Sequence, residues 1–238
     1  MKKIFLGSLI LLVSTSVLMP FTTLAESNTI DESVVQTATN DAEKNAEIQR
    51  FTDMQNEITL VLTIKNGRYV YDEKEIKSIV DSFDFNKLAT ETGIEFTNES
   101  FFQEAITNIK NTKFESQIQD RMANRYNRNY YEEGWNYQRV WWDESNTKRK
   151  IIEFEDVGQY AGLAGGIGGL AGSAVAGMIT GPIGVAISAS IGFGVFYDGW
   201  YFSNVALNLN RIKNGTGTVY ERNTWTTVYS LWTQDKYK

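Results

Sequence analysis

The chain has 238 residues with 29 acidic and 23 basic side chains, and it contains neither cysteine nor histidine. These absences exclude disulfides, thiol chemistry, Ser-His-Asp catalysis and ordinary zinc sites, so an enzyme would need paired carboxylates, a Ser-Lys pair or a carboxylate-bound cation. The acidic balance argues against a nucleic-acid partner, because phosphate binding needs clustered lysine and arginine.

The first 25 residues have the layout of a secretory signal peptide. Lys2 and Lys3 precede an apolar run from Ile4 to Met19, and small residues then lead to a cleavage site after Ala25. Cleavage there removes two of the 23 basic residues and leaves 21 against 29 acidic ones. We expect a secreted mature chain; an uncleaved N-terminal anchor is the alternative.

Residues 26–50 are polar and acidic, which predicts a disordered or loosely helical leader. A soluble α+β domain is expected over 51–154. Within it, Asn66-Gly67 separates two β-branched and aromatic runs, the strongest short-range signal for a β-hairpin. A helix is expected to begin at Asp72.

A longer helix is expected after Gly93, where Ser100 with Gln103 resembles a capping box. Apolar side chains follow at helical spacing, which predicts one buried stripe; a docking face for a partner is the alternative. The stripe comprises Phe102, Ile106, Ile109, Phe114, Ile118, Met122, Tyr126 and Tyr130.

The aromatic run from Tyr130 to Trp142 predicts a strand, with a return strand over 149–154. We interpret its rings as a sheet face that packs on the core, with glycan or membrane binding as alternatives. Glu132-Glu133 is interpreted as surface charge, since adjacent residues do not supply the carboxylate separation of a glycosidase. The group Asp81, Asp84 and Asn86 lacks the glycine and final glutamate of an EF-hand.

The stretch from Val157 to Tyr197 holds twelve glycines and no charge. A flexible linker is excluded because the stretch is rich in large apolar side chains. An isolated helix in water is disfavoured, since each interior glycine costs about 1 kcal/mol relative to alanine. Gly181-Pro182 marks a break between two halves of near-spanning length, which predicts a helical hairpin, the membrane segment, over 155–202.

Small residues recur every four positions in the first half, a pattern typical of helices that pack closely in lipid. These membrane or oligomer packing residues are Gly158, Gly162, Gly165, Gly166, Gly169, Gly172, Gly177 and Gly181. At the far end, Tyr197, Trp200 and Tyr201 are predicted to lie at the membrane interface. A buried glycine-zipper core is the alternative. The tail over 203–238 has the pattern of a β-hairpin.

The segment AGLAGGIGGLAGSAVAGMITGPIG is similar to glycine-zipper segments of secreted antibacterial proteins and toxins of Gram-positive bacteria. The layout of signal peptide, acidic soluble portion and glycine-rich apolar segment resembles large, cysteine-free, non-lantibiotic bacteriocins of the geobacillin type. This resemblance implies membrane-directed killing of related bacteria. It departs from small pore-forming bacteriocins in size and acidic charge.

We therefore expect an α+β fold in which a helix-plus-hairpin portion is followed by a glycine-rich helical hairpin and a C-terminal β-hairpin. The predicted function is a secreted antibacterial protein that permeabilises target membranes; it is not an enzyme and has no cofactor or metal. Its expected partners are membrane lipid, further copies of the chain and a surface receptor, without nucleic acid. The alternative is a membrane-retained adhesion protein with the hairpin as its anchor.

Overall fold

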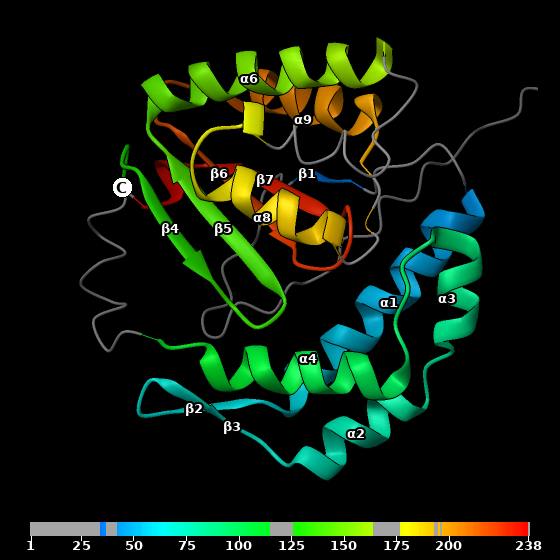
Figure 1. Cartoon of the computed structure of the whole chain (residues 1–238). Coiled ribbons are helices and arrows are strands. Elements are labelled where there is room, and N and C mark those ends of the chain that lie inside the picture. Colours follow the sequence, from blue (N-terminus) through cyan, green and yellow to red (C-terminus); the bar gives the residue numbers. More distant parts are fainter. Residues whose placement is uncertain are drawn as a thin grey trace, which may run out of the picture.

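The computed structural model describes residues 34–36, 42–114, 126–163, 177–192, 195 and 197–237 (Figure 1). The predicted signal peptide, Ile118 and Met122 lie outside these residues. The helices are α1 (Ala42–Val61), α2 (Glu73–Asp81), α3 (Phe85–Thr92), α4 (Asn98–Asn111), α6 (Glu144–Leu163), α8 (Pro182–Gly192), α9 (Gly199–Ile212) and the 3₁₀ turn η1 (Gln234–Tyr237); the strands are β1 (Val34–Gln36), β2 (Thr63–Lys65), β3 (Arg68–Val70), β4 (Tyr130–Glu133), β5 (Tyr137–Trp142), β6 (Thr218–Asn223) and β7 (Tyr229–Thr233). The expected α+β class is confirmed.

The predicted leader contributes to the folded body. It contains β1, and α1 begins at Ala42, where Glu47 and Ile48 are already buried. Of the two alternatives expected for this leader, disordered or helical, residues 42–50 are helical. The apolar side of α1, which includes Phe51 and Ile58, ties this helix to the core.

The N-terminal elements follow their local signals closely. Asn66 and Gly67 both have positive φ, 52° and 71°, and form the tight turn of the β2–β3 hairpin, as predicted. Asp72 caps α2 by accepting a hydrogen bond from the Lys74 amide at 2.8 Å.

The capping box of α4 was predicted in the wrong place. It pairs Thr97 with Ser100 rather than Ser100 with Gln103, because α4 begins at Asn98. The helix ends at Asn111, so the buried stripe stops at Ile109. The later members of the predicted stripe that the structure describes lie outside this helix, with Phe114 after its end, Tyr126 in a turn and Tyr130 in β4.

A five-stranded antiparallel sheet, in the order β1-β7-β6-β5-β4, forms the centre of the molecule. The C-terminal hairpin β6–β7 is confirmed, and its loop lies between Asn223 and Tyr229. Tyr131, Val140, Tyr220 and Leu231 are direct cross-strand neighbours. Because the side chains of directly opposed residues in neighbouring strands point to the same side, these four side chains share one face of the sheet.

The predicted return strand over 149–154 is wrong, since these residues belong to α6. Thr147, Ile151, Phe154 and Val157 are buried at spacings of three and four, so one helical face packs onto the sheet. The predicted boundary between residues 154 and 155 falls in the middle of α6. The ring of Phe154 lies 5.9 Å from that of Tyr220 on β6 and 6.2 Å from that of Phe202 on α9.

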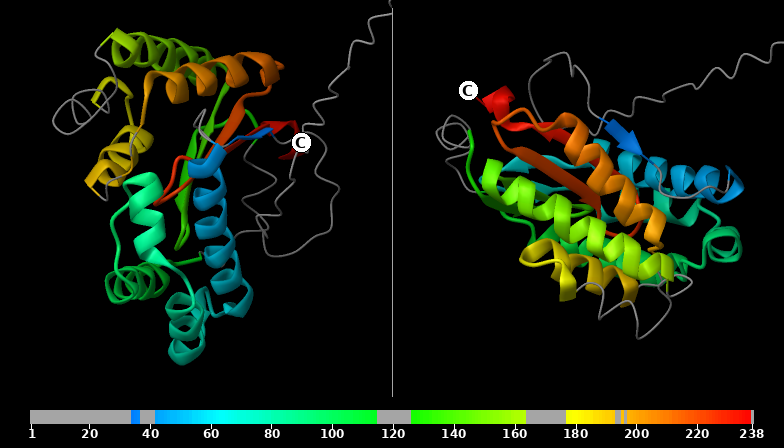
Figure 2. Two further views of the ribbon diagram at one scale, coloured as in Figure 1. Left: turned by 90° about the vertical axis from the view of Figure 1, so that its right-hand side faces the viewer. Right: turned by 90° about the horizontal axis from the view of Figure 1, so that it is seen from above.

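Helices α6, α9 and α8 lie on the same face of the sheet, with α6 and α9 side by side (Figures 1 and 2). Helices α1 to α4 lie at the end of the sheet that carries the β4–β5 turn and the β6–β7 loop. There Trp225 packs against Phe101 of α4, with ring centroids 5.1 Å apart, and against Trp135, 5.7 Å away. The core thus runs from the helical end into the sheet.

Candidate functional site

The first predicted packing glycine, Gly158, lies where α6 crosses α9. A Cβ atom added there would stand 2.4 Å from the Ser203 hydroxyl oxygen and 3.1 Å from the Gly199 carbonyl oxygen. Only a residue without a side chain permits this approach of the two helices. Close glycine-mediated helix packing is therefore present, but the partner helix belongs to the same chain and α9 rests on the sheet.

The other predicted glycines are distributed differently. Gly162 lies in the last turn of α6. Gly177 has open space around its Cα, and Gly181 adopts a φ of +84° directly before α8. Pro182 is the first residue of α8, a position that proline favours. Gly181 and Pro182 thus stand at the start of α8, whereas Gly165, Gly166, Gly169 and Gly172 lie outside the described residues.

The second half of the predicted hairpin is not one helix. α8 ends at Gly192 and α9 begins at Gly199, where the Asp198 carboxylate accepts a hydrogen bond from the Tyr201 amide at 2.8 Å. Asp198 is a strong N-cap residue and starts a new helix inside the predicted segment. Within the part of the chain that the structure describes, every helix is too short or too polar to cross a membrane.

Two of the three aromatics predicted at a membrane interface lie in the core. Tyr197 and Tyr201 are fully buried, with ring centroids 4.8 Å apart, and the Tyr201 hydroxyl bonds to that of Tyr220. Burial raises the pKa of Tyr201 well above its ordinary value. Trp200 alone is at the surface. The structure places these tyrosines as packing residues between α9 and the sheet.

A polar tie fastens the chain just before α8 to α6. The Lys150 ammonium, whose side chain is 3% exposed, donates to the Thr180 carbonyl oxygen at 2.6 Å and to Glu153 at 2.5 Å. Glu153 in turn accepts from the Thr180 amide at 3.0 Å and from its hydroxyl at 2.8 Å. Burial raises the pKa of Glu153, but hydrogen bonds from Lys150 and Thr180 outweigh it and hold the pKa below its usual 4.5.

A second tie fastens the far end of α8 to the sheet through a buried arginine. Arg222 of β6 is 1% exposed, and its guanidinium donates to the hydroxyls of Ser190 and Tyr197 and to Gln138 Oε1, the last at 2.9 Å. Its Nε has no hydrogen-bond partner among the described residues. A buried cation held by neutral acceptors is expensive unless its geometry is well satisfied.

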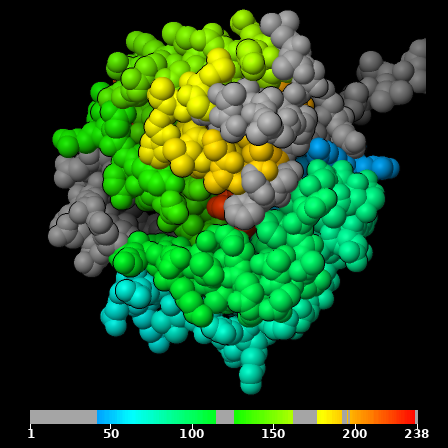
Figure 3. Space-filling view, in the orientation of Figure 1, coloured from blue at the N-terminus to red at the C-terminus, as the bar shows by residue number. Residues whose placement is uncertain are grey.

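Most of the exposed large apolar side chains of the described residues lie on the helices around the glycine-rich segment. They are Ile152 and Tyr160 on α6, Met178 before α8, Val185 on α8, and Trp200 and Leu207 on α9. The exceptions, Leu60 and Val70, lie on α1 and β3. Figure 3 shows α8 at the surface between α6 and α4.

The weaker candidates have structural roles. Asp84 caps α3, and Asp81 pairs with Lys77 at 3.2 Å. Glu132 is held by Arg139 at 2.5 Å, and Glu133 accepts from the Tyr131 hydroxyl at 2.7 Å. Within the described ranges, no group of three or more acidic side chains is placed to hold a metal ion.

The sequence did not predict the two ties, because Lys150, Thr180 and Arg222 are far apart in the chain. Nothing in their local patterns distinguishes them from surface residues. The searches against family models, curated proteins and solved structures find no match to this chain. Its own residues are therefore the basis for a functional proposal.

Proposed function

We propose that the chain is a secreted antibacterial protein that permeabilises target-cell membranes through its glycine-rich region. One observation supports this most: of the eight exposed large apolar side chains of the described residues, six lie on α6, α8 and α9 or just before α8. Such a concentration of exposed apolar groups is typical of surfaces that meet lipid or another protein.

The inserting portion in this proposal is narrower than 155–202. α9 buries Tyr201, Phe202, Val205 and Leu209 against the sheet, so its removal would open the core. α8 buries no aromatic side chain: its buried side chains are those of Ile183, Ala186, Ile187 and Ser190, and they lie between the two polar ties. Among the described elements α8 is therefore the one that leaves the body at lowest cost, while α6 and α9 stay in place.

Dye release from liposomes tests this proposal. Val185, 72% exposed on α8, is replaced by aspartate, and the matched control replaces Leu60, which is 71% exposed on α1. A carboxylate within an inserting helix costs about 3 kcal/mol in the bilayer centre. We expect Val185→Asp to reduce leakage by about tenfold or more, whereas Leu60→Asp leaks like the parent protein.

Three outcomes would reject the proposal. The parent protein could fail to release dye at any dose, both variants could lose activity equally, or both could retain it. Thermal unfolding of each variant distinguishes a loss of the fold from a loss of insertion. Fractionation of producing cells separates the adhesion alternative, which places the protein in the producer's own membrane rather than in the culture supernatant.

A further inference from the structure

The central sheet contains two buried arginines on neighbouring strands, one on β5 and one on β6. Arg139 is 9% exposed and Arg222 is 1% exposed. In the register of the sheet, Arg139 lies directly opposite Glu132 on β4 and Glu221 on β6. Arg222 follows Glu221 in the strand, so the two arginines project from opposite faces of the sheet. Their surroundings can therefore be compared within one scaffold.

Acidic side chains flank Arg139 on both sides. Its guanidinium forms an ion pair with Glu132 at 2.5 Å and a second ion pair with Glu221. Charge-assisted hydrogen bonds of this kind compensate the cost of burying the ions, because each group is bonded to one of opposite sign. Removal of Arg139 would leave the two carboxylates on one face of the sheet without the cation between them.

Arg222 is surrounded by neutral groups instead. Its guanidinium donates to the hydroxyls of Ser190 and Tyr197. It also donates to Oε1 of the half-buried Gln138 at 2.9 Å and to the Thr224 carbonyl oxygen at 3.4 Å. The Tyr197 ring lies 5.7 Å from the guanidinium carbon. Among the described residues Arg222 has no ion pair and its Nε has no acceptor, so its burial is costly.

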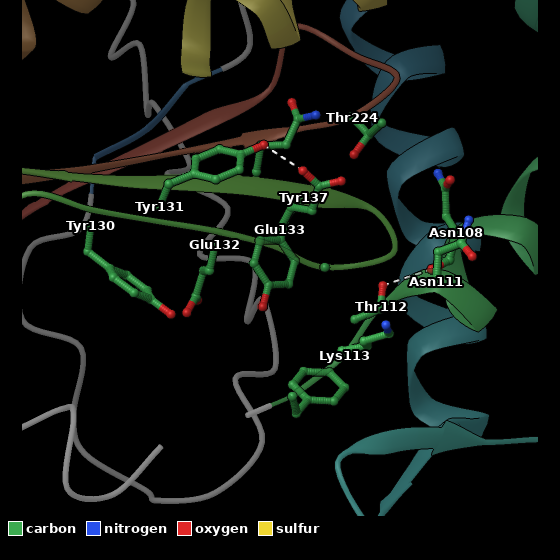
Figure 4. Close-up of a pocket in the computed structure, with 13 residues that line it drawn as sticks. Asn108, Asn111, Thr112, Lys113, Tyr130, Tyr131, Glu132, Glu133, Tyr137 and Thr224 are labelled. Carbon is green, nitrogen blue, oxygen red and sulfur yellow. Dashed lines mark hydrogen bonds between the residues drawn. The ribbon is translucent and has the colours of Figure 1, made fainter. Parts of the chain in front are cut away.

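The acid in the same row of side chains does not neutralise Arg222. Glu133 of β4 belongs to this row, but Gln138 lies between Glu133 and Arg222 in the register. Glu133 is exposed and accepts a hydrogen bond from the Tyr131 hydroxyl at 2.7 Å, beside the pocket drawn in Figure 4. The same view shows Glu132 on the other side of the hairpin. The charge of Arg222 therefore stays uncompensated within the sheet.

α8 takes part in closing this charge off from water. Ser190 lies in the last turn of α8, is 1% exposed, and accepts from the Arg222 guanidinium. When α8 leaves the sheet, water replaces Ser190 at the guanidinium and the charge regains hydration. That gain opposes the loss of buried apolar surface at Ile183 and Ile187. The polar contact at this end of α8 thus carries a cost that favours release of the helix.

We infer that Arg222 weakens the docking of α8 and thereby sets how readily this helix leaves the body. An uncharged side chain of similar length at this position would hold α8 more tightly. The effect on docking follows from the sheet and α8 alone, whereas its consequence for membrane leakage rests on the proposed function.

The hydroxyl groups around Arg222 do not depend on it for their own hydrogen bonds. The Ser190 hydroxyl lies 2.9 Å from the Ala186 carbonyl oxygen, and the Tyr197 hydroxyl lies 3.5 Å from that of Thr226. Each hydroxyl therefore has an acceptor for its proton when the guanidinium is absent. Replacing Arg222 by an uncharged side chain removes a desolvation cost and leaves neither buried hydroxyl donor without an acceptor.

Amide hydrogen exchange of two Arg222 variants tests this inference, because the expected changes have opposite signs. Arg222→Met removes the charge and keeps an unbranched side chain, whereas Arg222→Lys keeps the charge and loses the planar guanidinium with its hydrogen bonds. We expect the protection factors of α8 amides, relative to those of β5, to rise about tenfold or more in Arg222→Met and to fall in Arg222→Lys. A guanidinium that clamps α8 to the sheet would lower protection in both variants.

Arg139→Met is the matched control, since it makes the same replacement at the arginine that is ion-paired. It leaves Glu132 and Glu221 without their cation and should lower the Tm by about 6 °C or more. Arg222→Met should keep the parent Tm or raise it by up to about 4 °C. Circular dichroism followed during heating measures both changes.

The inference is overturned if Arg222→Met fails to fold, if its Tm falls as that of Arg139→Met does, or if its α8 protection factors are unchanged or lower. Dye release from liposomes is measured separately with the same variants. Higher α8 protection together with slower release supports both the inference and the proposed function. Higher α8 protection with unchanged release supports the inference and rejects α8 as the helix whose departure permeabilises the membrane.

Discussion

Gly158 shows how a single residue sets the spacing of two helices. The Ser203 amide nitrogen and the Gly199 carbonyl oxygen would lie 3.0 and 3.1 Å from a Cβ at this position. These are backbone atoms, which cannot move aside as a flexible side chain can. The close pairing of α6 with α9 therefore depends on the absence of one methyl group.

Gly158→Ala should lower the free energy of unfolding by about 1–3 kcal/mol, the usual cost of overpacking a tight contact. Urea unfolding followed by circular dichroism measures this change. Gly177→Ala is the control, because an added Cβ meets nothing within 4 Å there. It should leave the free energy of unfolding unchanged, since the added methyl group meets no neighbouring atom. Equal stability of the Gly158 variant and the parent would contradict this account.

At the level of elements, α8 differs from its neighbours in how it is held. α6 and α9 pack through aromatic rings such as Phe154 and Phe202, whereas α8 is fastened by polar groups at its two ends. Polar ties depend on charge and geometry, so they can be broken without disturbing the aromatic core. In the proposed mechanism α8 is therefore the described helix that leaves the body.

Glu153→Gln should loosen α8 selectively. It removes the carboxylate that accepts from Lys150 and from Thr180, at an expected cost of about 1–3 kcal/mol. Amide hydrogen exchange should become faster in α8 and unchanged in β5 and β6. Glu155→Gln is the control, because Glu155 is exposed and lies two residues further along α6, on a different face of the helix. It should leave amide exchange unchanged in both α8 and the sheet. Uniformly faster exchange across the whole protein would show that the tie supports the entire fold instead.

Acid should have the same effect on α8 in the parent protein. The pKa of Glu153 is lower in the folded protein than its ordinary 4.5, so the carboxylate stabilises the fold above that value. This contribution is lost as the pH falls below 4.5 and through the folded pKa. We therefore expect the protection factors of α8 amides, which correct for the pH dependence of intrinsic exchange, to fall over this range in the parent and to remain constant in Glu153→Gln.

At the scale of the whole molecule, a cluster of buried tyrosines joins α9 to the sheet. The Tyr229 ring lies 5.4 Å from that of Tyr201 and 5.9 Å from that of Tyr220, and its hydroxyl accepts from Asn208 at 3.1 Å. With no cysteine in the chain, this core is not reinforced by disulfides. Stability of the sheet and its helical cover thus depends on keeping these phenols neutral.

This cluster predicts cooperative alkaline unfolding. Burial raises the pKa of Tyr229 from 10.0 to about 12, and it raises those of Tyr201 and Tyr220 as well. Above pH 10 the unfolded chain loses these protons while the folded protein keeps them, so stability falls by about 1.4 kcal/mol per pH unit for each tyrosine. Phenolate absorbance and the loss of near-ultraviolet circular dichroism should therefore change together. Gradual ionisation near pH 10 in a folded protein would contradict the burial of these groups.

Local signals determined several elements of this protein from sequence alone. Asn66-Gly67 predicted a hairpin because few residue pairs tolerate two successive positive φ angles, and Asp72 predicted where α2 begins. The mixed α+β class and the C-terminal hairpin followed from the same kind of pattern. Each of these depends on neighbours within a few residues.

Tertiary structure alone decided how the apolar and charged residues are used. Residues 149–154 follow a turn-like stretch and were predicted as a return strand, but they become helical because Ile151, Phe154 and Val157 meet the sheet together. Tyr197 and Tyr201 had the composition of interfacial aromatics, yet they pack against Tyr220 and Arg222, which lie on β6. Composition records that a residue prefers to leave water, whereas its actual environment is set by contacts between segments distant in the chain.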